Sequence, residues 1–164
     1  MQTQTNNQTI TLMKAIKSFF ATDSKSFALL LVRLALAVVI LPHGMQKALG
    51  MFGGYGIEGT LGFFASMGMP VVLGVMVILA EFVAPMGLIL GLGTRFMAFA
   101  IGIEMTGAMI LGGHIHNGFF MNWFHNQPGE GIEYFILVIG SALALVLGGA
   151  GKWSIDAFIS KKLK

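Results

Sequence analysis

Residues 27–49 read FALLLVRLALAVVILPHGMQKAL, an apolar run interrupted only near its ends by charged or ionisable side chains. A helix needs about 20 apolar residues to cross the hydrocarbon core of a bilayer. Three further runs of comparable character follow at residues 70–92, 96–112 and 132–150, the third of the four runs being the shortest. This pattern predicts an all-α integral membrane protein, a bundle of four transmembrane helices.

The composition agrees with a membrane protein. Of 164 residues, 55% are hydrophobic and 10% are charged, against roughly 25% charged in soluble domains, and the mean hydropathy is +0.81. These values exclude a disordered chain, a nucleic-acid binder and a conventional soluble enzyme. Because the chain has no cysteine, disulfides, thiolate metal sites and iron–sulfur clusters are excluded as well.

We divide the chain into a polar segment (1–26), a four-helix membrane domain (27–151) and a basic tail (152–164). Within the first segment, residues 12–20 fit either an amphipathic helix on the membrane surface or a tail with one or two helical turns.

Lysine and arginine predict the orientation of the helices. Both tails and the connection between the second and third runs carry them, whereas the other two connections have only Lys47 at the edge of one. We therefore expect both termini in the cytoplasm and the loop at residues 113–131 outside.

Ionisable side chains inside a membrane are costly and indicate either a structural or a functional role. A rise of about 1.5 Å per residue places Arg33, Glu104 and Glu81 about 9, 12 and 16 Å from the cytoplasmic ends of their helices. We expect these three side chains to form an intramembrane charge cluster in which Arg33 pairs with a carboxylate. Such a cluster either locks the helices together or, because two buried carboxylates disfavour full ionisation, transfers protons.

A second polar cluster is predicted at the outer end. His43 and Lys47 lie four residues apart on the first helix, and Glu133 begins the fourth. Together they indicate a pocket for a polar ligand. Two alternatives need no ligand. His43 can be a hydrogen-bonded histidine of the core, and the negative charge of Glu133 can interact favourably with the N-terminus of its helix.

The outer loop contains three histidines, His114, His116 and His125. Imidazole suits zinc, copper or iron, but the spacing is not diagnostic and solvated loop histidines are common. We regard them as weak metal candidates and predict no encoded cofactor.

Several segments, in this order and spacing, resemble the DoxX family of small membrane proteins over roughly residues 27–160. They are Arg33-Leu34, His43-Gly44-x-x-Lys47, Phe52-Gly53-Gly54-Tyr55-Gly56, Gly59-Thr60, Glu81-Phe82, Gly91-Leu92-x-Thr94-Arg95, Asn117-Gly118-Phe119-Phe120, Glu133-Tyr134 and the stretch from Gly149 to Asp156. The resemblance supplies no catalytic residues and no role for Glu104.

The resemblance implies a four-helix protein of the bacterial cytoplasmic (inner) membrane, related to a subunit of a quinol oxidase or thiosulfate:quinone oxidoreductase and linked to soluble redox partner proteins. One function class is therefore a redox-linked subunit that meets a quinone. His43, Lys47 and Glu133 would contact its head group, with Tyr55 and Phe119 over the ring. The other class is a membrane scaffold or a carrier of small solutes or protons. The candidate partners are the lipid bilayer, a quinone, redox proteins and further copies of the chain.

Overall fold

The computed structural model describes the backbone of residues 2–163 and the side chains of residues 10–163. This part of the chain is all-α and contains no strand. The helices are α1 (Gln2–Phe20), α2 (Phe27–Leu49), α3 (Gly56–Ser66), α4 (Val71–Leu90), α5 (Thr94–Leu111), α6 (Glu133–Gly148) and α7 (Ile155–Lys162), with 3-10 turns η1 (Met51–Gly53) and η2 (His114–Asn117).

Three helices, α2, α4 and α5, are long and apolar enough to cross a membrane. α6 is apolar but has only 16 residues, fewer than the run at 132–150 suggested. It ends at Gly148 because Gly149 follows with a φ of +80°, a conformation that favours glycine and stops a helix.

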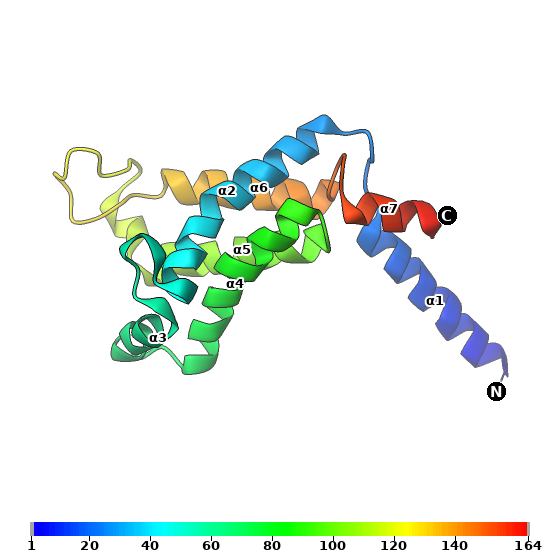
Figure 1. Cartoon of the computed structure of the whole chain (residues 1–164), viewed down its shortest axis with the longest axis horizontal. Coiled ribbons are helices and arrows are strands. Elements are labelled where there is room, and N and C mark those ends of the chain that lie inside the picture. Colours follow the sequence, from blue (N-terminus) through cyan, green and yellow to red (C-terminus); the bar gives the residue numbers. More distant parts are fainter. Residues whose placement is uncertain (1, 164) are drawn as a thin grey trace.

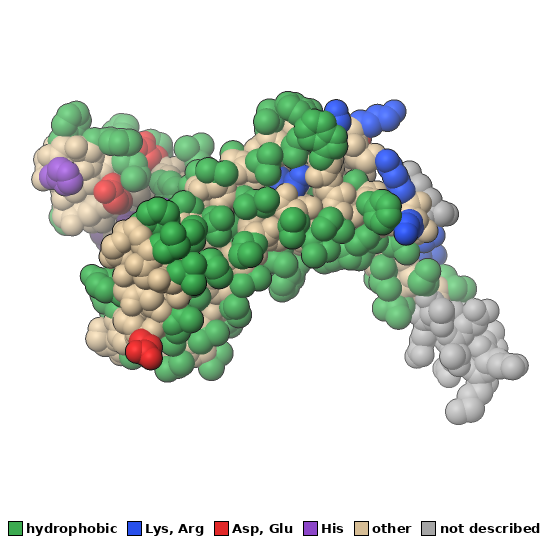
Figure 2. Space-filling model, viewed as in Figure 1, with side chains coloured by type: hydrophobic (Ala, Val, Ile, Leu, Met, Phe, Trp, Pro, Cys, Tyr) green, Lys and Arg blue, Asp and Glu red, His purple; other side chains and the backbone are tan. Residues whose placement is uncertain are grey.

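Helices α2, α4, α5 and α6 pack around one apolar core. In Figure 1 they run alongside one another between the terminal helices at one end and α3 with the loop at residues 113–131 at the other. Ile40, Leu88, Ile101 and Leu145 from the four helices are fully buried. Large apolar side chains cover the outside of the helices (Figure 2), as expected of a surface that faces lipid.

The two ends of the molecule differ in charge. The terminal helices α1 and α7 lie at one end, and α3 and the loop at residues 113–131 lie at the other (Figure 1). Lysine and arginine side chains gather at the end with α1 and α7, whereas acidic and histidine side chains appear at the opposite end (Figure 2). Lys164 of the basic tail lies outside the described residues.

Two segments are more helical than the sequence indicated. The N-terminal helix α1 begins at Gln2 rather than near residue 12. The connection at residues 50–69, which is not one of the four apolar runs, contains the 11-residue helix α3. Its glycine-rich start does remain irregular, because Gly50, Gly53 and Gly56 all have positive φ.

Helices α2 and α4 approach each other closely at Gly44. A Cβ atom added there would overlap the backbone carbonyl group of Glu81. Small residues at helix contacts allow such approach in membrane proteins. The absence of a side chain at Gly44 therefore sets the position of Glu81 relative to the last turn of α2.

We predict that Gly44→Ala separates α2 from α4 and destabilises the protein by about 1–3 kcal/mol, the usual cost of overpacking. Gly140→Ala on α6 is the matched control, because an added Cβ there meets nothing within 4 Å. Thermal unfolding in detergent should show a lower Tm for Gly44→Ala only. Equal melting of the two variants would show that the α2–α4 contact is not tight.

Candidate functional site

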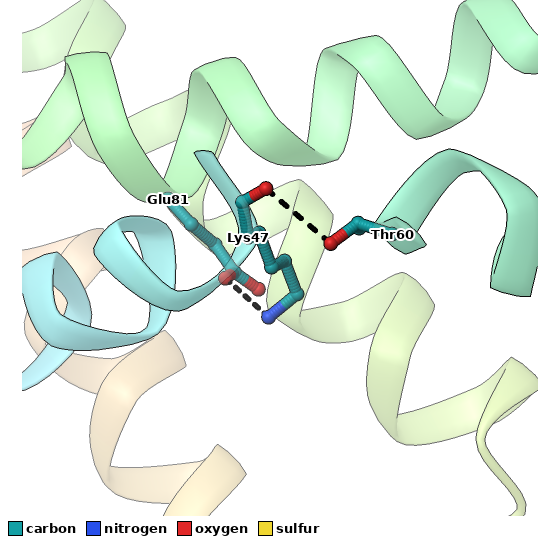
Figure 3. Close-up of polar contacts among 3 residues, drawn as sticks. All are labelled: Lys47, Thr60 and Glu81. Carbon is teal, nitrogen blue, oxygen red and sulfur yellow. Dashed lines mark hydrogen bonds and ion pairs between the residues drawn. The ribbon is translucent and has the colours of Figure 1, made fainter. Parts of the chain in front are cut away.

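An ion pair joins α2 to α4 inside the molecule. Lys47 Nζ lies 2.5 Å from Glu81 Oε2 (Figure 3), and the side chains are 26% and 5% exposed respectively. Lys47 is in the last turn of α2, one turn after Gly44, which contacts the Glu81 backbone. The Thr60 hydroxyl of α3 donates to the Lys47 carbonyl at 3.3 Å, so α3 packs directly against this turn.

Two further helices contribute polar side chains to the same place. Glu104 of α5 neighbours Glu81 and Lys47 and interacts electrostatically with both. Tyr134 of α6 interacts with both glutamates. We call Lys47, Glu81, Glu104 and Tyr134 the carboxyl cluster.

The carboxyl cluster contains polar atoms that lack partners. Glu104 Oε2 and the Tyr134 hydroxyl are both buried and have no hydrogen-bond partner among the described residues. One is an acceptor and the other can donate, and such atoms are costly to bury unsatisfied. The cluster also has two carboxyl groups but one lysine, so its charge is unbalanced when all three side chains are ionised.

An open apolar groove of about 460 Å³ lies against α6 and the outer loop. Its lining residues are Phe119, Met121, Trp123, Glu133, Tyr134, Ile136 and Leu137. The loop is held against the start of α6 because the Glu133 amide donates to the Phe119 carbonyl at 2.9 Å. Tyr134 therefore belongs both to the groove wall and to the carboxyl cluster.

The residues predicted for an outer ligand pocket are only partly brought together. Glu133 and Phe119 line the groove, and the exposed His43 ring lies 6.5 Å from that of Tyr134. Lys47 instead pairs with Glu81. Tyr55 is 78% exposed beside α3 and is not among the groove residues.

The predicted pairing of Arg33 with Glu81 or Glu104 is wrong. Arg33 is separate from the two glutamates, and Glu81 pairs with Lys47 instead. Arg33 is fully buried but donates only to backbone carbonyls, those of Leu88, Ile89, Ala150, Lys152 and Trp153. The reason is that the last carbonyls of α4 have no partner within the helix, and a guanidinium offers five donors to satisfy them.

Glu133 has a local role as well as a groove position. Its Oε1 accepts from the Met121 amide at 2.9 Å, and Glu130 Oε2 similarly accepts from the Asn122 amide at 2.5 Å. These carboxylates satisfy backbone donors in the outer loop.

The loop histidines do not form a metal centre. Across residues 10–163, no three His, Cys, Asp or Glu side chains are grouped so that they could hold a metal ion. His114 lies with its Nδ1 2.8 Å from the Glu130 carbonyl oxygen, while His116 and His125 are exposed. The part of the chain that the structure describes therefore does not bring these three histidines together as a metal-ligating group.

Sequence reasoning missed Tyr134 as a site residue. The only signal was a phenol inside an apolar run directly after Glu133. It also missed Arg95, which donates to the terminal carbonyls of α6 at Val146 and Leu147. Asp156 was likewise overlooked; it accepts from the Gly93 and Thr94 amides at 2.8 Å each.

We predict that Lys47→Met leaves the buried Glu81 carboxylate without its cation and destabilises the protein by about 3–5 kcal/mol. Adding Glu81→Gln should restore part of this stability, because the unpaired charge is removed. The measurement is chemical or thermal unfolding of the single and double variants.

Arg33→Met serves as the comparison in the same experiment. It should also destabilise, because it removes donors from five carbonyls, but Glu81→Gln should not restore stability in this background. Rescue of Arg33→Met, with none of Lys47→Met, would mean that Arg33 is the real partner of Glu81.

The model of the DoxX family matches residues 28–114, which run from α2 to the end of α5 and include Lys47, Glu81 and Glu104. Tyr134 and all the other residues that line the groove lie beyond this match. Comparisons with curated proteins and with solved structures gave no significant match. Because the matched segment covers more than half of the sequence, the chain belongs to the DoxX family.

Proposed function

We propose that this multi-pass membrane protein is a redox-linked subunit that binds a quinone or quinol in the groove beside Tyr134 and acts with partner proteins. The observation that carries the proposal is the groove itself. It is apolar, is open at its surface, and shares Tyr134 with the carboxyl cluster.

The chemistry of the groove suits an aromatic head group with a hydrophobic tail. Phe119 and Trp123 offer rings for stacking. Glu133 provides a carboxylate and His43, near Tyr134, provides an imidazole that can donate or accept a proton. Since quinone reduction and quinol oxidation move electrons as well as protons, the proposal includes a redox protein as electron donor or acceptor.

For the arrangement in the membrane, we propose that α6 is the fourth crossing helix and that both termini are cytoplasmic. Support comes from the lysines and arginines gathered at the end that carries α1 and α7 (Figure 2). Positive residues favour the cytoplasmic side, which in a bacterium means the inner membrane. We propose that α1 lies at the lipid interface, and the exposed apolar side chains of Leu12, Met13 and Phe19 support this position.

A scaffold or small-solute carrier is the second candidate. The observation that favours it is that Arg33 and Lys47 both find partners within the chain itself. In that function the charges hold helices together, and the groove receives a lipid or a partner helix rather than a quinone.

The topology is tested with reporter fusions. A reporter at the C-terminus and one inserted in the loop at residues 113–131 should lie on opposite sides of the membrane, the C-terminal one in the cytoplasm. Reporters found on the same side would overturn the arrangement of four crossings.

Quinone binding is tested by titrating a short-chain quinone analogue into purified protein. Leu137 is 72% exposed and lines the groove, so Leu137→Trp should fill it and weaken binding at least about tenfold, equal to about 1.4 kcal/mol. His43→Ala should also weaken binding.

Leu143→Trp is the matched control, because Leu143 is 56% exposed on the same helix but outside the groove. Binding to this variant should equal that of the wild type. No binding to the wild type, or equal binding to all variants, would favour the scaffold.

A further inference from the structure

We propose that Glu81 and Glu104 hold one exchangeable proton between them, which makes the carboxyl cluster a proton-binding site that communicates with the groove through Tyr134. This proposal rests on the cluster and does not require that a quinone binds. It gives a function to two glutamates that the family match includes without assigning them a role.

The first argument is charge. With Lys47, Glu81 and Glu104 all ionised, the cluster carries a net charge of −1 from two carboxylates and one ammonium. The cationic Arg33 does not offset this charge, because its donors are engaged by carbonyls elsewhere. An uncompensated charge inside an apolar helix bundle is expensive, and one proton makes the cluster neutral.

The second argument is geometry. Glu104 Oε2 is buried and has no hydrogen-bond partner among the described residues, and an ionised carboxylate oxygen is costly to bury in that state. The Lys47 ammonium contacts Oε2 of Glu81, which identifies Glu81 as the carboxylate of the pair. The proton therefore belongs to Glu104, whose side chain lacks such a cation contact.

A path toward the surface follows from the unpartnered atoms. The Tyr134 hydroxyl can donate, Glu104 Oε2 can accept, and both are buried without partners among the described residues. In this proposal we expect a rotated hydroxyl or one bridging water to join the two atoms. Tyr134 is also a groove residue, so the phenol connects Glu104 with the groove.

The ionisable groups that face the site come from all four core helices. They are Lys47 of α2, Glu81 of α4, Glu104 of α5 and Tyr134 of α6, with His43 of α2 beside the tyrosine ring. The carboxylate of Glu133, which precedes Tyr134 in the sequence, accepts a hydrogen bond from the Met121 amide. A sodium ion is the competing occupant, because it would balance the same charge.

The test is infrared spectroscopy of the protein reconstituted in lipid at neutral pH, in sodium-free buffer and in sodium buffer. The wild type should show the carbonyl band of a protonated carboxylic acid in both buffers, shifted in heavy water. Isotopic labelling of the glutamate carboxyl carbons should shift the band, which identifies it without any mutation.

Glu104→Gln should abolish the band, and Tyr134→Phe should retain it but slow its exchange in heavy water. Glu58→Gln, an exposed change on α3, is the matched control and should leave both band and exchange unchanged. Absence of the band in the wild type, or its persistence in Glu104→Gln, would overturn the proposal. Loss of the wild-type band on adding sodium would assign the site to a metal cation instead.

Discussion

The ion pair between Lys47 and Glu81 is the contact on which the interior of this protein depends. Lipid offers no partner to a charged side chain, so each charge placed among the apolar helices must be balanced from within the chain. Gly44 lets the α2 backbone approach Glu81 closely, and the ammonium then reaches the carboxylate over 2.5 Å. The pair fixes α2 against α4 and holds Glu81 where α5 and α6 can add Glu104 and Tyr134.

The same constraint explains the opposite end of the molecule, where the unsatisfied groups are backbone carbonyls at helix C-termini. Arg33 donates to those of α4, and Arg95 donates to those of α6. Asp156 satisfies the opposite kind of group, because its carboxylate accepts hydrogen bonds from the backbone amides at the start of α5. Side chains from distant parts of the sequence thus satisfy the helix ends beside the termini. The carboxyl cluster and the groove lie towards the loop at residues 113–131, so they are separated along the helices from these anchored ends.

The sequence was sufficient for the all-α class and for the position of α2, because long apolar runs bounded by glycine and charge have few other interpretations. It also identified Lys47, Glu81 and Glu104 as unusual. It could not pair them, because a depth estimate along each helix says nothing about its rotation. Arg33 was assigned to a carboxylate on reach alone, whereas its donors bond carbonyls contributed by residues 55 to 120 positions away. Tyr134 was missed because one phenol in an apolar run resembles core packing until α6 is placed beside α5.

The central claim is that Lys47, rather than Arg33, is the cation that pairs with the intramembrane carboxylate of Glu81. Solid-state NMR of isotopically labelled protein in lipid bilayers measures it directly, through the dipolar coupling between side-chain nitrogen and glutamate carboxyl carbon. The account predicts a strong coupling from Lys47 Nζ to the carboxyl carbon of Glu81, and none from the Arg33 guanidinium to a glutamate. A guanidinium–carboxylate coupling at Arg33, with none at Lys47, would contradict it.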